Sequence, residues 1–208
     1  ICITSSIGGE GKTFVAMNLA SIFSITQGKT ILIGADMRKP KIFNDFKLTN
    51  DIGLSSYLSS QNSKEEVIQN TEYENLDIIL SGPIPPNPSE LLSLNKMEEF
   101  IKELKKTYQN IIIDTPPIGL VTDGLILMNH SDVNIYVIRQ NFTTKDMLNN
   151  LNETIIKNNV VNMNLVINDI SIDKTSYGYG YGYGNTYGYG YYTEDQSLNN
   201  KPWWKIKI

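Results

Sequence analysis

The sequence has 208 residues, of which 40% are hydrophobic, enough for one domain of ordinary size with a single large core. A formal net charge of −4 and the absence of a basic cluster argue against nucleic acid as the main partner. The single cysteine, Cys2, excludes an internal disulfide framework and favours a reducing compartment. No apolar run approaches the roughly 18 residues of a membrane-spanning helix, and no signal peptide is visible. Because the chain starts on a strand residue without an initiator Met, we expect it to be a piece of a longer protein or a chain trimmed at its start.

Apolar runs and helical patterns alternate along most of the chain. Strands are predicted at residues 1–4, 30–33, 76–80, 111–113, 133–138 and 161–167. Helices are predicted at 14–26, from 89 onward, and at 96–108, 123–129 and 145–158. Ser89 is the expected cap of its helix, because the prolines before it require a loop. The alternation predicts an α/β fold with a parallel sheet and helices on both faces, and ligand-binding residues at the strands' carboxyl ends.

A glycine-rich loop lies between the first predicted strand and the first helix. Its sequence, Ser6-Ile7-Gly8-Gly9-Glu10-Gly11-Lys12-Thr13, has the form of a phosphate-binding loop, with Ser6 at a position where glycine is usual. Small residues let backbone N–H groups surround phosphate oxygens, and the helix N-terminus favours an anion. Lys12 is expected to reach the β- and γ-phosphates, and the Thr13 hydroxyl to bind Mg²⁺. The alternative is a glycine-rich turn without a ligand.

Two carboxylates follow predicted buried strands. Asp114 comes directly after three isoleucines and is suited to a Walker-B-type role, and Asp36 lies just after the second strand. An acid after a strand is often only a helix cap or a solvated turn. Both acids nevertheless fall at the edge of the sheet where ligands gather. Asn168, at the end of the last predicted strand, falls at the same edge.

The last segment of the chain differs in kind from the rest. Eight of the twelve tyrosines lie here, most of them alternating with glycine: Tyr177, Tyr179, Tyr181, Tyr183, Tyr187, Tyr189, Tyr191 and Tyr192. Alternating glycine weakens any strand, so we predict a flexible tail at 171–208 that follows a single nucleotide-binding domain at 1–170. Low-complexity sequence without chemistry is the alternative interpretation of the tail.

Taken together, these features resemble the cytoplasmic kinase domain of the bacterial tyrosine kinases that accompany exopolysaccharide and capsule export. The resemblance is carried by residues 6–13, 31–38, 87–92, 111–117 and the tyrosine-rich tail. This family shares a P-loop NTPase-like fold with partition and septum-positioning ATPases. Those relatives usually carry a signature lysine early in the loop, where this chain has Ile7, and they lack a tyrosine tail.

The resemblance implies that the γ-phosphoryl group of ATP passes to a tail tyrosine of a neighbouring copy in a ring. The residues that it assigns to the nucleotide are Gly8, Gly9, Glu10, Gly11, Lys12, Thr13 and Phe14, with Arg139 and Asn168 as candidate adenine contacts. Thr13, Asp36 and Asp114 would hold Mg²⁺, and Lys12, Asp36 and Asp114 would carry the chemistry. The implied partners are a membrane polysaccharide co-polymerase module, which would place the chain at the cytoplasmic face of the bacterial inner membrane, and an opposing tyrosine phosphatase.

One position departs from the family's pattern. Three apolar residues are expected before Asp-x-Asp-x-Arg, and Gly34 replaces the first acid. Glycine neither binds metal nor accepts a proton, so phosphotransfer is expected to be reduced or absent while nucleotide binding survives. Two alternatives to an autokinase therefore stay open: a nucleotide-controlled assembly switch of the partition-ATPase type, and a scaffold with an interaction tail.

Overall fold

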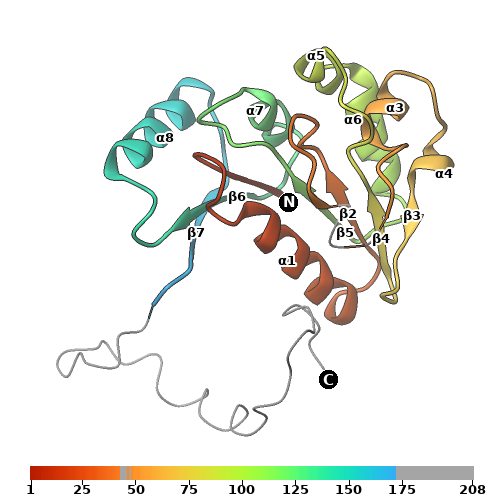
Figure 1. The fold of residues 1–208 in the computed structure, drawn as a ribbon, viewed down its shortest axis with the longest axis horizontal. Helices are drawn as coiled ribbons and strands as arrows, with labels where there is room; N and C mark the ends of the chain where they lie inside the picture. Colours follow the sequence, from red (N-terminus) through yellow and green to blue (C-terminus); the bar gives the residue numbers. More distant parts are fainter. Residues whose placement is uncertain (43–45, 47, 172–208) are drawn as a thin grey trace, which may run out of the picture. The chain divides into compact units, whose positions relative to one another are not determined.

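A computed structural model describes residues 1–42, 46 and 48–171 (Figure 1). Among these residues a seven-stranded sheet has the order β3-β4-β2-β5-β1-β6-β7. The strands are β1 (Cys2–Ser5), β2 (Thr30–Gly34), β3 (Gln69–Asn70), β4 (Leu76–Ile79), β5 (Asn110–Asp114), β6 (Asn134–Arg139) and β7 (Met163–Asn168). All neighbouring pairs are parallel except β3 with β4. The expected tyrosine-rich tail lies outside the described residues.

Helices cover both faces of this sheet (Figure 1). They are α1 (Lys12–Thr26), α3 (Leu54–Leu58), α4 (Lys64–Val67), α5 (Pro88–Leu92), α6 (Asn95–Leu104), α7 (Asp123–Met128) and α8 (Lys145–Lys157). Successive strand residues point to opposite faces. Ile31 and Ile33 pack with α3, α5, α6 and α7, whereas Leu32 packs with Ala16 and Ala20 of α1. A strand buried on both faces must be apolar throughout, which explains the continuous apolar runs of the sequence.

The predicted parallel α/β architecture is confirmed, but three local predictions are wrong and one strand was missed. The helix predicted at 96–108 ends at Leu104, where tighter turns follow, although Tyr108 is still buried. The last strand begins at Met163, because Asn162 adopts a left-handed conformation with φ 54°. Strand β3 was not predicted, since its two residues are polar. Ser89 is not a helix cap: α5 begins one residue earlier, at a proline.

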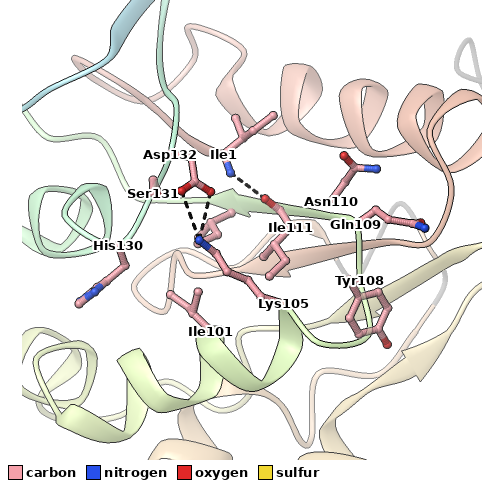
Figure 2. Close-up of a pocket in the computed structure, with 11 residues that line it drawn as sticks. Ile1, Ile101, Lys105, Tyr108, Gln109, Asn110, Ile111, His130, Ser131 and Asp132 are labelled. Carbon is pink, nitrogen blue, oxygen red and sulfur yellow. Dashed lines mark hydrogen bonds and ion pairs between the residues drawn. The ribbon is translucent and has the colours of Figure 1, made fainter.

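The amino end of the sheet carries a small pocket of about 100 Å³ (Figure 2). It lies where β1, β5 and β6 begin and where α6 ends. The backbone amine of Ile1 donates to the carbonyl of Ile111 at 2.8 Å. Figure 2 also shows Lys105 directed at Asp132, with the Lys105 Nζ atom 3.1 Å from Asp132 Oδ2. Among the described residues, no helix is long and apolar enough to cross a membrane.

Candidate nucleotide-binding site

The glycine-rich loop connects the carboxyl end of β1 to the N-terminus of α1. Gly9 and Gly11 have φ values of 93° and 98°, a left-handed conformation that glycine adopts without strain. A Cβ atom on Gly11 would lie 2.0 Å from the Asn168 Nδ2 atom, so a side chain there would collide with the end of β7. The loop's conformation therefore depends on glycine at these two positions.

Side chains from late in the chain brace this loop from behind. The buried Glu10 carboxylate accepts hydrogen bonds from the Ile7 amide at 2.9 Å and from the Thr143 hydroxyl. Asn168 donates to the Glu10 carbonyl at 3.0 Å, and Arg139 donates to the Gly9 carbonyl at 3.1 Å. The loop is thus held in place by hydrogen bonds from the ends of β6 and β7, a form of preorganisation for binding.

Ser6, the unusual first residue of the loop, is also engaged. It is 3% exposed, and its hydroxyl is hydrogen-bonded to the hydroxyl of Tyr136 in β6. Burial raises the pKa of Tyr136, so this residue remains a neutral phenol. Serine at this position is therefore used for packing the loop against the sheet. Sequence reasoning did not find Tyr136, because a tyrosine within an apolar strand gives no signal beyond burial.

The predicted chemical residues converge in front of the loop. The Thr13 hydroxyl donates to Asp114 Oδ2 at 2.8 Å. Lys12 Nζ lies 3.4 Å from Asp36 Oδ2 and 3.7 Å from Asp114 Oδ1. The parallel pairing of β2 with β5 brings Asp36 and Asp114 close together, because Gly34 at the end of β2 is the partner of Asp114. Four side chains that are separated by up to 102 positions in sequence thus form one cluster.

Asp114 is the most buried member of the cluster, with 2% of the residue exposed against 9% for Asp36. Its Oδ1 atom has no hydrogen-bond partner among the described residues. Burial raises the pKa of Asp114 above its usual range, against the opposing effects of Lys12 and the Thr13 hydroxyl. An unsatisfied buried carboxylate oxygen beside a threonine hydroxyl and a second acid suits a hard cation such as Mg²⁺. The described residues contain no group of three or more His, Cys, Asp or Glu that is suited to a metal, so waters and phosphate oxygens would have to complete the shell.

Asp36 is fixed from its other side. Its Oδ1 atom accepts hydrogen bonds from the backbone amides of Arg38 at 3.3 Å and Lys39 at 3.0 Å. The carboxylate is therefore held by the turn that follows β2 and directed at Lys12 by its remaining oxygen. This arrangement orients Asp36 without any ligand.

A second buried acid, Asp123, anchors the same turn. Arg38 contacts it with two nitrogens, Nε at 2.9 Å and Nη2 at 3.2 Å, and the Ser89 hydroxyl donates to it at 2.6 Å. Burial alone would raise the pKa of Asp123, but the hydrogen bonds from Arg38 and Ser89 outweigh it and hold the pKa below its usual value. The sequence offered Ser89 as a helix cap and through the similarity of residues 87–92 to the family, and Asp123 was not identified as a site residue.

A cavity of about 300 Å³ opens beside this cluster. Six predicted residues line it: Gly8, Gly9, Gly11, Lys12, Thr13 and Asp36. Three cations that were not predicted, Arg38, Lys39 and Lys41, form another part of its wall. Pro116, Pro117, Leu120 and Val121 provide an apolar part. A cationic pocket with glycine amides and an apolar wall is suited to a nucleotide.

Four predicted ligand contacts do not line this cavity. Glu10, Arg139 and Asn168 contact the loop itself, as described above. Phe14 lies in the first turn of α1 and is 40% exposed. Asp114 lines a much smaller adjoining space of about 10 Å³ together with Gly34. A Cβ atom on Gly34 would meet Ile42 Cδ1 and the Ser81 amide nitrogen at 3.4 Å each, so a side chain fits there after only small shifts.

Known proteins resemble the chain over this whole region. The model of the AAA domain family matches residues 1–167. YwqD, a tyrosine-protein kinase of Bacillus subtilis, is 44% identical over 146 residues, which are 70% of this chain and 62% of YwqD. CpsD of Streptococcus pneumoniae serotype 4, also named a tyrosine-protein kinase, is 34% identical over 179 residues, 86% of this chain and 79% of CpsD. The solved kinase domain of the Escherichia coli tyrosine kinase ETK has a TM-score of 0.79 at 31% identity, covering 87% of this chain and 71% of that one.

The matched region thus spans less than two thirds of YwqD and more than two thirds of CpsD. The sheet order, the glycine-rich loop and these likenesses establish a P-loop NTPase-like fold, which implies nucleotide binding. The resemblance to capsule-type kinases that the motifs suggested is confirmed by relatives that cover most of the chain. The chain belongs to the bacterial tyrosine kinase family.

Proposed function

We propose that the protein is an ATP-dependent protein-tyrosine autokinase. Residues 1–170 would form the kinase domain, and the tyrosines from Tyr177 to Tyr192 in the segment 171–208 would accept phosphate from neighbouring copies in a ring. The observation that carries the proposal is the cluster of Lys12, Thr13, Asp36 and Asp114, which stands at a cavity beside a braced phosphate-binding loop.

The proposal assigns chemical tasks to all four members of the cluster. The amides of the loop and the Lys12 ammonium bind the β- and γ-phosphates and offset the negative charge that develops during transfer. Thr13, Asp36 and Asp114 would hold Mg²⁺, which supplies further charge neutralisation when it is bound. A tyrosine hydroxyl with a pKa of about 10 is a poor nucleophile at neutral pH. Asp36, which lines the cavity and is held by two backbone amides, would orient that hydroxyl and accept its proton.

A second candidate is favoured by one specific observation. Gly34 stands beside Asp114 at a position where the family's pattern has an acid, so the site offers one carboxylate fewer. A protein with this site would still bind nucleotide through Lys12 and Thr13 while transferring phosphate slowly. It would then act as a nucleotide-controlled assembly switch or a scaffold.

The test is incubation of the purified chain with ATP and Mg²⁺, followed by intact mass measurement and mapping of phosphate. We expect added phosphate on tail tyrosines, none in Lys12→Met, and an unchanged amount in Lys105→Met. The last variant is the matched control, because it removes a lysine at the opposite end of the sheet. Nucleotide binding without added phosphate would favour the switch.

The cellular role that we propose follows from the family. Autophosphorylation would regulate polymerisation and export of an exopolysaccharide or capsule, together with a membrane co-polymerase module and an opposing tyrosine phosphatase. The chain would then work at the cytoplasmic face of the inner membrane. Each phosphate adds close to two negative charges, so a multiply modified tail would repel its neighbours and loosen a ring.

A further inference from the structure

The cavity beside the loop is lined by more cations than carboxylates. Its lining includes four cations and one carboxylate, Asp36. Lys12 is directed at Asp36 and Asp114, and Arg38 is held by Asp123. Lys39 and Lys41 are exposed, and neither forms an ion pair with any residue in the described parts of the chain. Two ammonium groups are therefore available to a ligand.

These two lysines belong to the wall that carries Asp36 rather than to the loop. The Lys39 amide donates to Asp36 Oδ1 at 3.0 Å, and Lys41 follows two residues later. The loop, with Lys12 and its own amides, lies on the phosphate side of the site. A substrate hydroxyl that approaches Asp36 would therefore bring its flanking residues past Lys39 and Lys41. This wall is suited to recognising charge next to the acceptor tyrosine.

The chain's own sequence contains a matching ligand. From Tyr177 to the last residue, the only acidic residues are Glu194 and Asp195, directly after Tyr191-Tyr192-Thr193. The other six tail tyrosines are flanked by glycine, serine, asparagine and threonine. We propose that Lys39 and Lys41 recognise the Glu194–Asp195 pair of an incoming tail and thereby favour Tyr191 and Tyr192 as acceptors. This inference rests on the proposed kinase function and adds the substrate specificity of the same site.

Length and charge are both compatible with this recognition. An extended chain advances about 3.3 Å per residue, so a tail bound in an extended form would carry Asp195 about 10 Å beyond Tyr192. That reach is comparable to the width of a cavity of about 300 Å³. Exposed ion pairs contribute modestly and are screened by salt. The lysines are therefore expected to choose among tyrosines rather than to supply most of the affinity.

A binding experiment tests the recognition independently of catalysis. The probe is a fluorescent peptide of residues 186–197, and its matched control carries Glu194→Gln and Asp195→Asn. The receptor is the full chain with the same two substitutions in its own tail, so that it does not compete with the probe. We expect the acidic peptide to bind about fivefold more tightly at low salt, with the difference lost at high salt. Equal binding of the two peptides would overturn the inference.

Charge exchange makes the test specific to the two lysines. A receptor with Lys39→Glu and Lys41→Glu should instead prefer a peptide that carries Glu194→Lys and Asp195→Lys. The same exchange at Lys102 and Lys105, which lie away from the cavity, should leave the original preference unchanged. If the exchange at Lys39 and Lys41 weakens ATP binding without altering the preference between peptides, the lysines serve the nucleotide and the inference is wrong.

Phosphate mapping on the full chain separates this inference from the function on which it rests. At early times with ATP and Mg²⁺, phosphate should be found first on Tyr191 and Tyr192, and the Glu194→Gln, Asp195→Asn chain should lose this preference. Phosphate spread evenly over the tail would overturn the inference and leave the kinase function standing. Absence of phosphate from every tyrosine would contradict the kinase function, and the peptide experiment would still decide the recognition.

Discussion

Each end of the sheet carries an ion pair between a lysine and an aspartate, and the two pairs differ in their exposure to solvent. At the carboxyl end, the side chains of Lys12 and Asp114 are 11% and 3% exposed and lie 3.7 Å apart. At the amino end, Lys105 and Asp132 are closer, at 3.1 Å, but their side chains are 49% and 79% exposed. Lys105 and Asp132 line the pocket shown in Figure 2, whose volume is about 100 Å³.

This difference shows that burial, not the distance within an ion pair, distinguishes the chemical end of the sheet. Water weakens charge interactions at the amino end, whereas the apolar surroundings at the carboxyl end strengthen them and leave one Asp114 oxygen unsatisfied. Substitutions that treat the two ends alike should therefore have very unequal effects.

The largest effect is expected from removing the cation at the carboxyl end. Lys12→Met should lower the rate of phosphate incorporation by at least about 10³-fold, because Lys12 is the cation that, among the described residues, pairs with both Asp36 and Asp114. Lys105→Met should leave the rate within about twofold, since its charge is screened by water. Time courses of intact mass measure both. A comparable loss in the two variants would mean that the amino end also contributes to catalysis.

Asp114→Asn should separate activity from stability. We expect phosphate incorporation to fall by about 10²-fold or more through loss of a metal ligand. The nucleotide-free protein should become more stable, by roughly 1 kcal/mol, because a buried and incompletely paired carboxylate is removed.

The stability that Asp114→Asn adds is expected to depend on pH. The raised pKa of Asp114 means that its protonated form stabilises the fold below the unfolded value of about 3.9, and that this contribution declines as the pH rises toward the folded pKa. The stability advantage of the Asn variant should therefore grow with pH above about 4. Urea unfolding across this range provides the measurement, and an advantage that shrinks with rising pH would contradict the role of burial.

Asp123→Asn should destabilise the turn that holds Asp36. We expect the free energy of unfolding to fall by about 1–2 kcal/mol at neutral pH. The loss is no larger because the side chain of Arg38 is partly exposed to water. The pKa of Asp123 is lowered in the folded protein, so its contribution is present above the unfolded value of about 3.9 and is lost as the pH falls through the folded pKa. The difference between the variant and the parent should thus disappear in acid. Asp132→Asn is the control, with little change expected at any pH.

The sequence predicts those parts of the fold and site that depend on local patterns, and it does not predict those that depend on which strands become neighbours. The sheet and its loop were predicted because buried parallel strands are continuously apolar and phosphate loops need glycine at fixed spacing. Asp36 and Asp114 were found because they lie at the carboxyl ends of such strands. The register that brings Gly34 opposite Asp114 was not accessible, since it depends on which strands are neighbours.

The residues that sequence reasoning missed act through tertiary contacts. Tyr136 and Thr143 brace the loop from β6 and the turn after it, and Asp123 reaches Arg38 across 85 positions. None of them belongs to a local pattern. Arg139 and Asn168 were correctly placed at strand ends, but they contact the loop's carbonyls in the described structure, and their proposed adenine contacts stay a prediction.

Gly34→Asp should have a moderate effect in the opposite direction. The position accommodates a Cβ atom, and a carboxylate there would join Asp36 and Asp114 at the small adjoining space. Phosphate incorporation should rise several-fold if the missing acid limits catalysis. Gly34→Ala is the matched control, because it adds the Cβ without the charge. Equal rates in all three proteins would show that the remaining acids suffice, and an equal rise with alanine would point to backbone stiffening.

The smallest effect is expected from the ion pair at the amino end. A double-mutant cycle with Lys105→Met and Asp132→Asn should give a coupling of about 0.5 kcal/mol or less, because two exposed side chains lose conformational freedom to gain an attraction that water screens. High salt should remove even this coupling. Urea unfolding of the four proteins supplies the numbers. A coupling above about 2 kcal/mol would mean that a short distance suffices without burial, and the contrast between the two ends of the sheet would then need a cause other than solvent exposure.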